Sequence, residues 1–170
     1  MNRYDFIIVG GGAAGFFAAL SAAGQRRDLR ILILEQGEQP LAKVRISGGG
    51  RCNVTHACFD PREFARHYPR GEQALIGAFQ RFQAGDTVEW FASRGVRLKA
   101  EDDGRMFPET DSSQTIVDCL LSAAKAAGVR LRSNCGVESV VRRGDCRFDV
   151  VLSDGTTETL ATSAIALADM

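Results

Sequence analysis

The sequence predicts an α/β, Rossmann-like half-domain with a mostly parallel sheet and a β-meander. The first observation behind this prediction is a strand, a glycine turn, a helix and a second strand within residues 4–34, which is the size of a βαβ unit. The second is a run of extended segments with glycine-containing turns over residues 136–160, the pattern of an antiparallel meander. A chain of 170 residues can bury a core, and we expect residues 1–170 to belong to one domain.

The first half of the chain is expected to open with the βαβ unit. Continuous apolar runs predict buried parallel strands at residues 4–9 and 30–34, and an alanine-rich stretch predicts a helix over residues 13–24. Residues 36–61 are expected to form a long loop, and such loops in compact domains are usually functional. Two helices are expected next, over residues 72–82 and 86–94.

The second half is expected to alternate between extended segments and one clear helix. Residues 95–109 predict two short extended pieces joined by a turn at Asp103-Gly104, and residues 111–128 predict a helix that Gly128 terminates. Asp111 or Ser112 is the expected cap of this helix. The remaining expectations are a strand at 129–133, meander turns at Gly144-Asp145 and Asp154-Gly155, and a last buried strand at 163–168.

Composition excludes several classes of protein. Acidic and basic residues balance at 21 each, which gives no electrostatic reason to expect nucleic acid or a membrane surface as a partner. No apolar run approaches the roughly 20 residues of a transmembrane helix, and the first residues lack the pattern of a signal peptide. The five cysteines contain no CxxC pair, so we expect no metal site, reduced thiols and a cytoplasmic location.

A glycine fingerprint lies between the first predicted strand and the first helix. Gly10, Gly12 and Gly15 spell GxGxxG, and Glu35 closes the second strand about 20 residues later. The helix N-terminus would offer free N–H groups to a pyrophosphate, and Glu35 would accept hydrogen bonds from a ribose diol while repelling a 2′-phosphate. A glycine turn that binds nothing is the alternative, but the placement of strand, helix and acid favours a dinucleotide site other than for NADP.

A second glycine-rich motif, SGGGRCNVT, occupies residues 47–55. Three glycines weaken any helix or strand, but they leave the backbone open as an anion-binding nest or as a floor beneath a flat ring. Arg51 adds a fork of donors, Asn53 a donor with an acceptor, and Lys43 a positive charge. Taken alone, this segment fits a flexible surface loop slightly better than a binding site.

Together the two motifs resemble those of a known family. The run SGGGRCNxT after a GxGxxG…E unit, with the later segment GRMFPETDSSQTIVDCLL, is similar to the BaiN/RdsA-type flavoproteins. These are also described as YhiN-like or aminoacetone-oxidase-like NAD(P)/FAD-dependent oxidoreductases, and the resemblance covers nearly the whole chain.

The resemblance implies FAD, with its adenine end on the Gly10–Gly15 turn and Glu35 and its flavin side along Lys43 and the Ser47–Asn53 loop. Val137 matches a position at which related folds touch adenine through the backbone. The implied cofactor-binding residues are Gly10, Gly12, Ala13, Ala14, Gly15, Glu35, Gln36, Lys43, Ser47, Gly48, Gly49, Gly50, Arg51, Cys52, Asn53 and Val137.

The chain departs from the family pattern in two places. Leu41 stands where the family usually has a glycine. Family members also continue past the strand at 163–168 into an inserted domain and a C-terminal FAD segment. We therefore expect this chain to be an N-terminal portion, truncated or frameshifted.

Three functional readings stay open. The first is a flavoprotein oxidoreductase that uses reduced nicotinamide, or an amine-like or steroid-like substrate, as electron donor or acceptor. The second is direct NAD binding at the same turn. The third is a non-catalytic fragment or binding module whose partner covers an apolar helix face at Phe16, Phe17 and Leu20.

No catalytic residue can be assigned from the sequence. Cys52 is expected to be an ordinary thiol. His56 and His67 are the only histidines, and each is expected to be a loop residue rather than a general base.

Overall fold

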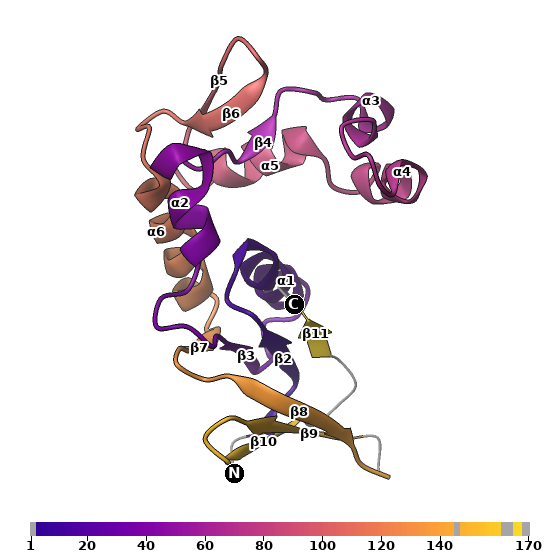
Figure 1. Ribbon diagram of the computed structural model, residues 1–170, viewed down its shortest axis with the longest axis vertical. Helices are drawn as coiled ribbons and strands as arrows, with labels where there is room; N and C mark the ends of the chain where they lie inside the picture. The colour runs from indigo at the N-terminus through magenta and orange to yellow at the C-terminus, as the bar shows by residue number, and fades with distance from the viewer. Residues whose placement is uncertain (1–2, 145–146, 161–164, 168–170) are drawn as a thin grey trace. The chain divides into compact units, whose positions relative to one another are not determined.

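The computed structural model describes residues 3–144, 147–160 and 165–167, and it divides into two compact units (Figure 1). The first unit comprises Met1–Lys43 and Leu120–Met170, and the second comprises Val44–Cys119. The division falls within two helices, α2 (Ala42–Gly50) and α6 (Ser113–Ala126).

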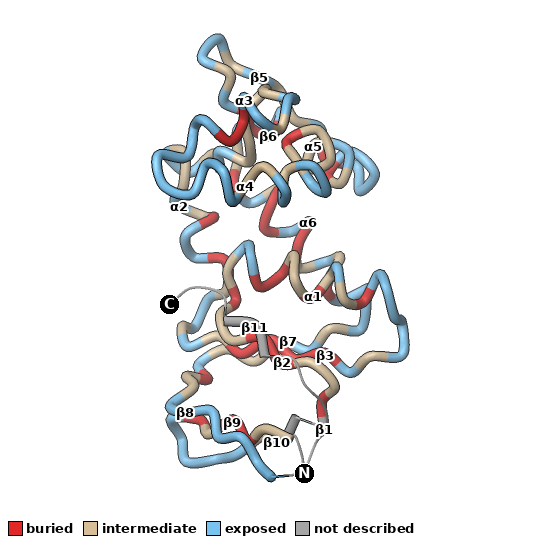
Figure 2. The backbone as a smooth tube through the Cα atoms, turned by 90° about the vertical axis from the view of Figure 1, so that its right-hand side faces the viewer, coloured by how far each residue is buried: buried red, intermediate tan, exposed pale blue. Residues whose placement is uncertain are grey.

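The first unit is built on a four-stranded parallel sheet. Its strand order is β11-β2-β3-β7, with β2 (Phe6–Val9), β3 (Ile31–Leu34), β7 (Arg130–Arg132) and β11 (Ile165–Leu167). As predicted, β2 and β3 are adjacent and parallel. Helix α1 (Ala13–Gln25) lies over one face of this sheet and the meander over the other, which gives the unit three layers (Figures 1 and 2).

The meander forms a second four-stranded sheet. Its order is β1-β10-β9-β8, with β1 (Arg3–Tyr4), β8 (Val137–Arg142), β9 (Phe148–Leu152) and β10 (Thr157–Leu160). Strand β1 pairs with β10, so the predicted strand at 4–9 is divided between two sheets at Asp5. The Asp154-Gly155 turn is present, whereas Asp145 and the ends of the predicted strand at 163–168 lie outside the described residues.

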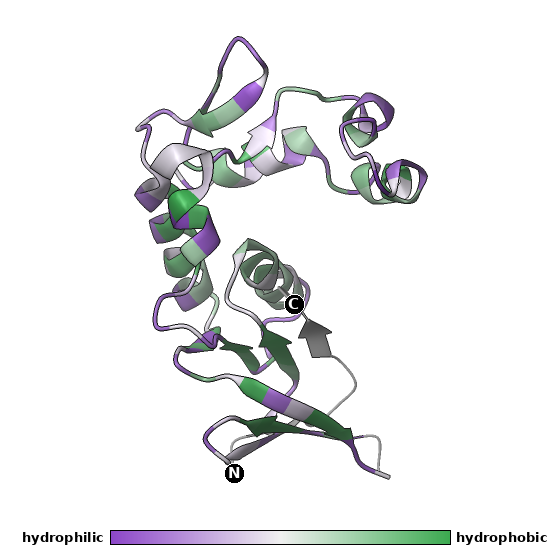
Figure 3. Cartoon of the chain, viewed as in Figure 1, coloured by the Kyte–Doolittle hydropathy of each residue, from purple (hydrophilic) through white to green (hydrophobic). Residues whose placement is uncertain are grey.

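A hydrophobic core fills the space between the parallel sheet and the meander. Its buried residues come from both sheets and the loop after β7: Tyr4, Ile7, Leu32, Leu34, Cys135, Val150 and Leu152. Strands β2, β3 and β9 are accordingly hydrophobic along most of their length (Figure 3). Because each fully buried Leu or Ile side chain contributes about 1.5–3 kcal/mol, this cluster is a main source of stability for the unit.

The buried face of α1 differs from the predicted one. Phe16 is 0% exposed and shares a face with Ala19 and Ala23, which follow it at helical spacings of three and seven residues. The expectation that Phe16 is uncovered is therefore wrong, while Phe17 and Leu20 are half-buried. Phe16 therefore needs no partner to cover it, whereas a partner chain over Phe17 and Leu20 stays a prediction.

The second unit contains a small antiparallel sheet and short helices. Its sheet order is β4-β6-β5, with β4 (Thr55–His56), β5 (Leu98–Ala100) and β6 (Arg105–Pro108). Its helices are α3 (Pro61–Ala65), α4 (Glu72–Phe79) and α5 (Ala84–Ala92). The predicted hairpin with its turn at Asp103-Gly104 is present, as are both predicted helices.

The predicted long loop at 36–61 is partly wrong, because it contains helix α2. The helical backbone of α2 is broken at Ser47, which is extended (φ −64°, ψ 150°), and Gly48 and Gly49 then adopt left-handed conformations. Helix α3 also begins at the end of this segment, where the Asp60 side chain caps it by accepting hydrogen bonds from two backbone N–H groups. None of the helices within the described residues is long and apolar enough to cross a membrane.

Candidate functional site

The glycine turn of the first unit connects β2 to α1 at close range. The Gly10 N–H donates to the Leu34 carbonyl at 2.8 Å, which anchors the turn to β3. A Cβ at Gly15 would lie 2.1 Å from the Gly10 carbonyl oxygen. Only glycine fits at position 15, so the close packing of helix against turn depends on it.

The Glu35 carboxylate lies directly beside this turn. Its Oε2 accepts a hydrogen bond from the Gly11 N–H and its Oε1 accepts one from the Gly37 N–H, both at 2.7 Å. A carboxylate has about four lone-pair sites, so each oxygen can still accept a bond from a ligand hydroxyl. The predictions did not include Gly11 and Gly37, although Gly11 is a variable position within the fingerprint.

Leu41 ties the segment after Glu35 to the same turn. Its N–H donates to the Gly11 carbonyl at 2.8 Å, and its side chain is 1% exposed. Its φ is 60°, in the left-handed region that favours glycine. The family usually has a glycine at this position, and glycine adopts this left-handed conformation without strain. This chain adopts the same backbone conformation with a leucine.

The first turn of α1 is exposed and has no side-chain cap. Gly12 precedes the helix with extended dihedral angles, and Ala13 and Ala14 are exposed and uncharged. The first N–H groups of a helix have no partner within it, and the helix dipole makes this end positive. Of the other predicted residues in this unit, Gln36 and Lys43 are exposed, and Val137 is half-buried beside the core cluster.

The second unit holds the other glycine-rich motif, and it is an ordered turn. The Ser47 hydroxyl donates to the Val44 carbonyl and the Cys52 N–H donates to the Ser47 carbonyl, both at 2.9 Å. A Cβ at Gly48 would lie 2.8 Å from both the Asn53 nitrogen and the Phe107 ring, whereas Cβ atoms at Gly49 and Gly50 would meet no described atom within 4 Å. The backbone at Gly49 and Gly50 is therefore bare and accessible.

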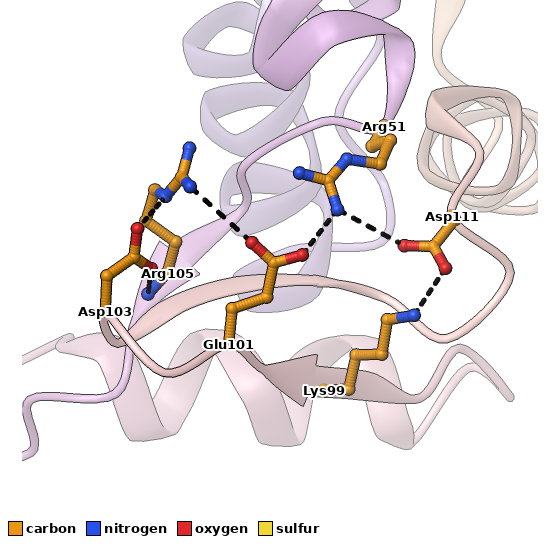
Figure 4. A network of polar contacts seen from close by, with 6 residues as sticks. All are labelled: Arg51, Lys99, Glu101, Asp103, Arg105 and Asp111. Atoms are coloured by element: carbon orange, nitrogen blue, oxygen red, sulfur yellow. Dashed lines mark hydrogen bonds and ion pairs between the residues drawn. The ribbon is translucent and has the colours of Figure 1, made fainter.

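Arg51 lies in a network of charged side chains (Figure 4). Its Nη1 donates to Glu101 Oε1 at 2.5 Å and lies 3.6 Å from Asp111 Oδ1, while its guanidinium carbon lies 4.0 Å from the centre of the Phe107 ring. Lys99 pairs with Asp111, and this ammonium, followed by Arg51, lowers the pKa of the Asp111 carboxyl. The sequence could not indicate Glu101 and Asp111, because both are distant from Arg51 along the chain.

The cysteines of the described residues are free thiols. Cys52 is buried, and burial raises the pKa of its thiol, although a hydrogen bond with Ser47 opposes this shift. A thiol with a raised pKa is a poor nucleophile at neutral pH. The direction of this shift agrees with the expectation of an ordinary thiol, and Cys146 lies outside the described residues.

The two histidines lie together in the second unit. The ring centroids of His56 and His67 are 4.9 Å apart, and His56 Nε2 lies 3.0 Å from the Asp103 carbonyl oxygen. Since a carbonyl can only accept, Nε2 is the protonated nitrogen of His56. Throughout the described ranges, no three His, Cys, Asp or Glu side chains gather as metal ligands would.

The fold and the glycine turn define a Rossmann-like domain with the features of a dinucleotide site. Residues 4–169 match the family described as "HI0933-like protein Rossmann domain", and the chain belongs to this family. The family resemblance seen in the sequence is thereby confirmed.

Two curated relatives show how much of a longer protein the match covers. The chain is 33% identical over 142 residues to a ribosomal RNA dihydrouridine synthase of Escherichia coli (strain K12), covering 84% of this chain and 34% of that protein. It is 31% identical over 140 residues to a 3-dehydro-bile acid delta(4,6)-reductase of Clostridium scindens, covering 82% of this chain and 33% of that protein. The chain thus spans about a third of the length of these relatives.

A solved structure with a similar fold is 3-ketosteroid-delta4-(5alpha)-dehydrogenase from Rhodococcus jostii RHA1, in complex with 4-androstene-3,17-dione. The TM-score is 0.70 over 97% of this chain and 45% of that chain, at 15% sequence identity. At this identity the likeness concerns the fold alone.

Proposed function

We propose that this chain is the FAD-binding portion of a flavoprotein oxidoreductase and that it binds the ADP moiety of FAD on the Gly10–Gly15 turn. The observation that carries this proposal is the Glu35 carboxylate, held 2.7 Å from the Gly11 N–H with acceptor capacity left for a ribose diol. The exposed first turn of α1 offers N–H donors to the pyrophosphate. Membership of a family whose motifs resemble those of FAD-dependent oxidoreductases supports FAD as the ligand.

The other residues that the resemblance implies belong to the same proposal. Val137 would contact adenine through its backbone, and Gln36 and Lys43 would lie along the cofactor. The Ser47–Asn53 loop would also take part in FAD binding, which its bare backbone at Gly49 and Gly50 supports. FAD, when bound, supplies hydride and electron transfer, so the protein's task is to bind and orient it.

For the whole protein we propose two-electron reduction of a carbon–carbon double bond, or its reverse, as the reaction class. The printed names of the two relatives describe formation of dihydrouridine and reduction of a bile acid. A reduced nicotinamide is the proposed electron donor. Direct NAD binding at the Gly10–Gly15 turn is the rival reading, and the Ser47–Asn53 loop argues against it because a plain NAD domain does not need such a loop.

The test is a fluorescence titration of the 170-residue chain with FAD, comparing the parent with Gly12→Ala. A Cβ at Gly12 would occupy the space needed by the pyrophosphate, so we expect a loss of about 1–3 kcal/mol in binding, roughly 5- to 150-fold in Kd. Gly24→Ala is the matched control on the same helix, since its Cβ would meet no described atom within 4 Å. A denaturant melt of each variant separates lost binding from lost folding.

The competing ligands decide between the readings. FMN, which lacks the AMP part of FAD and therefore the adenosine and one phosphate, should bind more weakly than FAD. Equal FAD affinity in Gly12→Ala and the parent would remove the dinucleotide site from this turn. Tight binding of NAD without binding of FAD would establish the rival reading.

A further inference from the structure

Arg51 enters the charged network of the second unit with only part of its guanidinium. Both of its ion-pair contacts, to Glu101 and to Asp111, are made by Nη1. Within the part of the chain that the structure describes, Nε and Nη2 make no hydrogen bond or ion pair, and the dashed lines that leave Arg51 in Figure 4 start from the one nitrogen Nη1. The side chain is 33% exposed, and the N–H groups of Nε and Nη2 are donors that the network does not use.

The orientation of the guanidinium is fixed from two directions. Glu101 Oε1 binds one end at 2.5 Å, and the Phe107 ring, which is 0% exposed, lies against the guanidinium face with its centroid 4.0 Å from the central carbon. Charge-assisted bonds and stacking on an aromatic ring are both directional contacts of arginine. Neither contact uses Nε or Nη2 as a hydrogen-bond donor.

Net charge does not explain how this network would attract a ligand. Figure 4 shows three cations, Arg51, Lys99 and Arg105, with three carboxylates, Glu101, Asp103 and Asp111, so the network is neutral overall. A neutral cluster binds an oxygen through the direction of its donors rather than through long-range attraction. The position of the Arg51 donors therefore matters more than their charge, and Glu101 makes the shortest contact that sets it.

From these contacts we infer that Glu101 is a positioning residue, which holds Arg51 on Phe107 so that its Nε and Nη2 donate to an oxygen of bound FAD. This role rests on the proposed function. The inference goes beyond the Ser47–Asn53 loop, because Glu101 belongs to the β5–β6 hairpin and no sequence motif indicated a role for it.

The test is a double-mutant cycle on FAD affinity in the full chain, with parent, Glu101→Gln, Arg51→Met and the double variant. We expect Glu101→Gln to raise the Kd about tenfold, since it removes one charge-assisted bond. Because Glu101 acts only through Arg51, it should have no further effect in the Arg51→Met background. Asp103→Asn is the matched control: it removes a charge from the same hairpin, and Asp103 pairs with Arg105 instead.

A second readout is the Arg51 Nε–H signal in the 15N NMR spectrum. This signal should shift when FAD is added to the parent and should shift less in Glu101→Gln. If Arg51 had only a structural role, the addition of FAD would leave its Nε–H signal unchanged. If Glu101→Gln does not fold, Glu101→Asp keeps the charge but shortens the side chain, and we expect a smaller loss of affinity.

The outcomes separate the two claims. If the parent binds no FAD, the proposed function fails and the role of Arg51 fails with it. If the parent binds FAD and Glu101→Gln binds it equally well, only the positioning role is overturned. If Glu101→Gln weakens FAD binding by the same factor in the Arg51→Met background as in the parent, the positioning role of Glu101 is also overturned.

Discussion

Leu41 shows how one residue can combine a backbone cost with a packing gain. Its φ of 60° costs about 1–2 kcal/mol for a residue with a Cβ, but its side chain is 1% exposed. Replacing a buried leucine with a smaller residue costs about 2–5 kcal/mol. Packing therefore outweighs strain, and we predict that Leu41→Gly lowers the free energy of unfolding by about 1–3 kcal/mol in a urea titration. A variant as stable as the parent would show that the side chain contributes little.

Gly48 and Gly49 give a matched comparison within one turn. Both have left-handed dihedral angles, φ 57° and 67°, so an alanine at either position is strained by about 1–2 kcal/mol. Only Gly48 lacks room, because its Cβ would lie 2.8 Å from a backbone nitrogen and from the Phe107 ring.

We predict that Gly48→Ala destabilises the protein by about 1–3 kcal/mol more than Gly49→Ala, since overpacking is added to the same strain. Chemical denaturation of both variants measures the difference. Equal losses would mean that the turn is not packed against Phe107.

At the scale of elements, Asp5 joins the start of β2 to the start of β3. Its carboxylate accepts hydrogen bonds from the Arg30 N–H, Nε and Nη2, each at 2.9 Å. The Arg30 side chain and then its backbone N–H lower the pKa of Asp5 from 3.8 to about 2. The folded state thus favours the ionised carboxylate.

The direction of the pH effect follows from this lowered pKa. The stabilisation is fully present above the unfolded value near 3.8 and is lost as the pH falls toward about 2. We predict that Asp5→Asn reduces the free energy of unfolding by at most about 1 kcal/mol at pH 7, because the pair is partly exposed. Unfolding measured at several pH values should show this difference shrinking between pH 4 and pH 2. A difference that stays constant across this range would contradict the assignment.

The sequence predicted those elements whose signal is local. Strands β2 and β3 and helices α1 and α6 follow from apolar runs and helical periodicity within each segment. Helix α2 was missed because three glycines follow its short helical part, and glycine disfavours helix. The pairing of β1 with β10 joins opposite ends of the chain, so no local pattern could reveal it.

The candidate site was likewise predictable only where its signal is local in the sequence. The position of Glu35 was predictable because the βαβ unit fixes its distance from the glycine turn. Its bonds to Gly11 and Gly37 depend on how the chain turns after β3, and the partners of Arg51 come from another hairpin. Long-range contacts of this kind depend on tertiary structure rather than on residue spacing.

At the scale of the whole molecule, the chain consists of two units, and each unit holds one of the two glycine-rich motifs. The first unit holds the Gly10–Gly15 turn and Glu35, and the second holds the Ser47–Asn53 loop with Arg51. The chain has no net formal charge at pH 7, so its net charge provides no long-range attraction for an anionic ligand. The ADP part of FAD needs only groups of the first unit, which makes ADP the simplest probe of the central claim.

The most direct measurement is therefore a titration of the 15N-labelled chain with ADP, followed by NMR. The account predicts that the largest shifts fall on the amide signals of Gly11, Gly12, Ala13 and Ala14, with Gly37 shifting as the ribose reaches Glu35. It also predicts that Glu35→Leu weakens ADP binding about tenfold or more, because the two ribose hydroxyls lose their hydrogen bonds to the charged Glu35 carboxylate. ADP shifts that are absent from Gly11–Ala14, or that are the same in Glu35→Leu and the parent, would contradict the account.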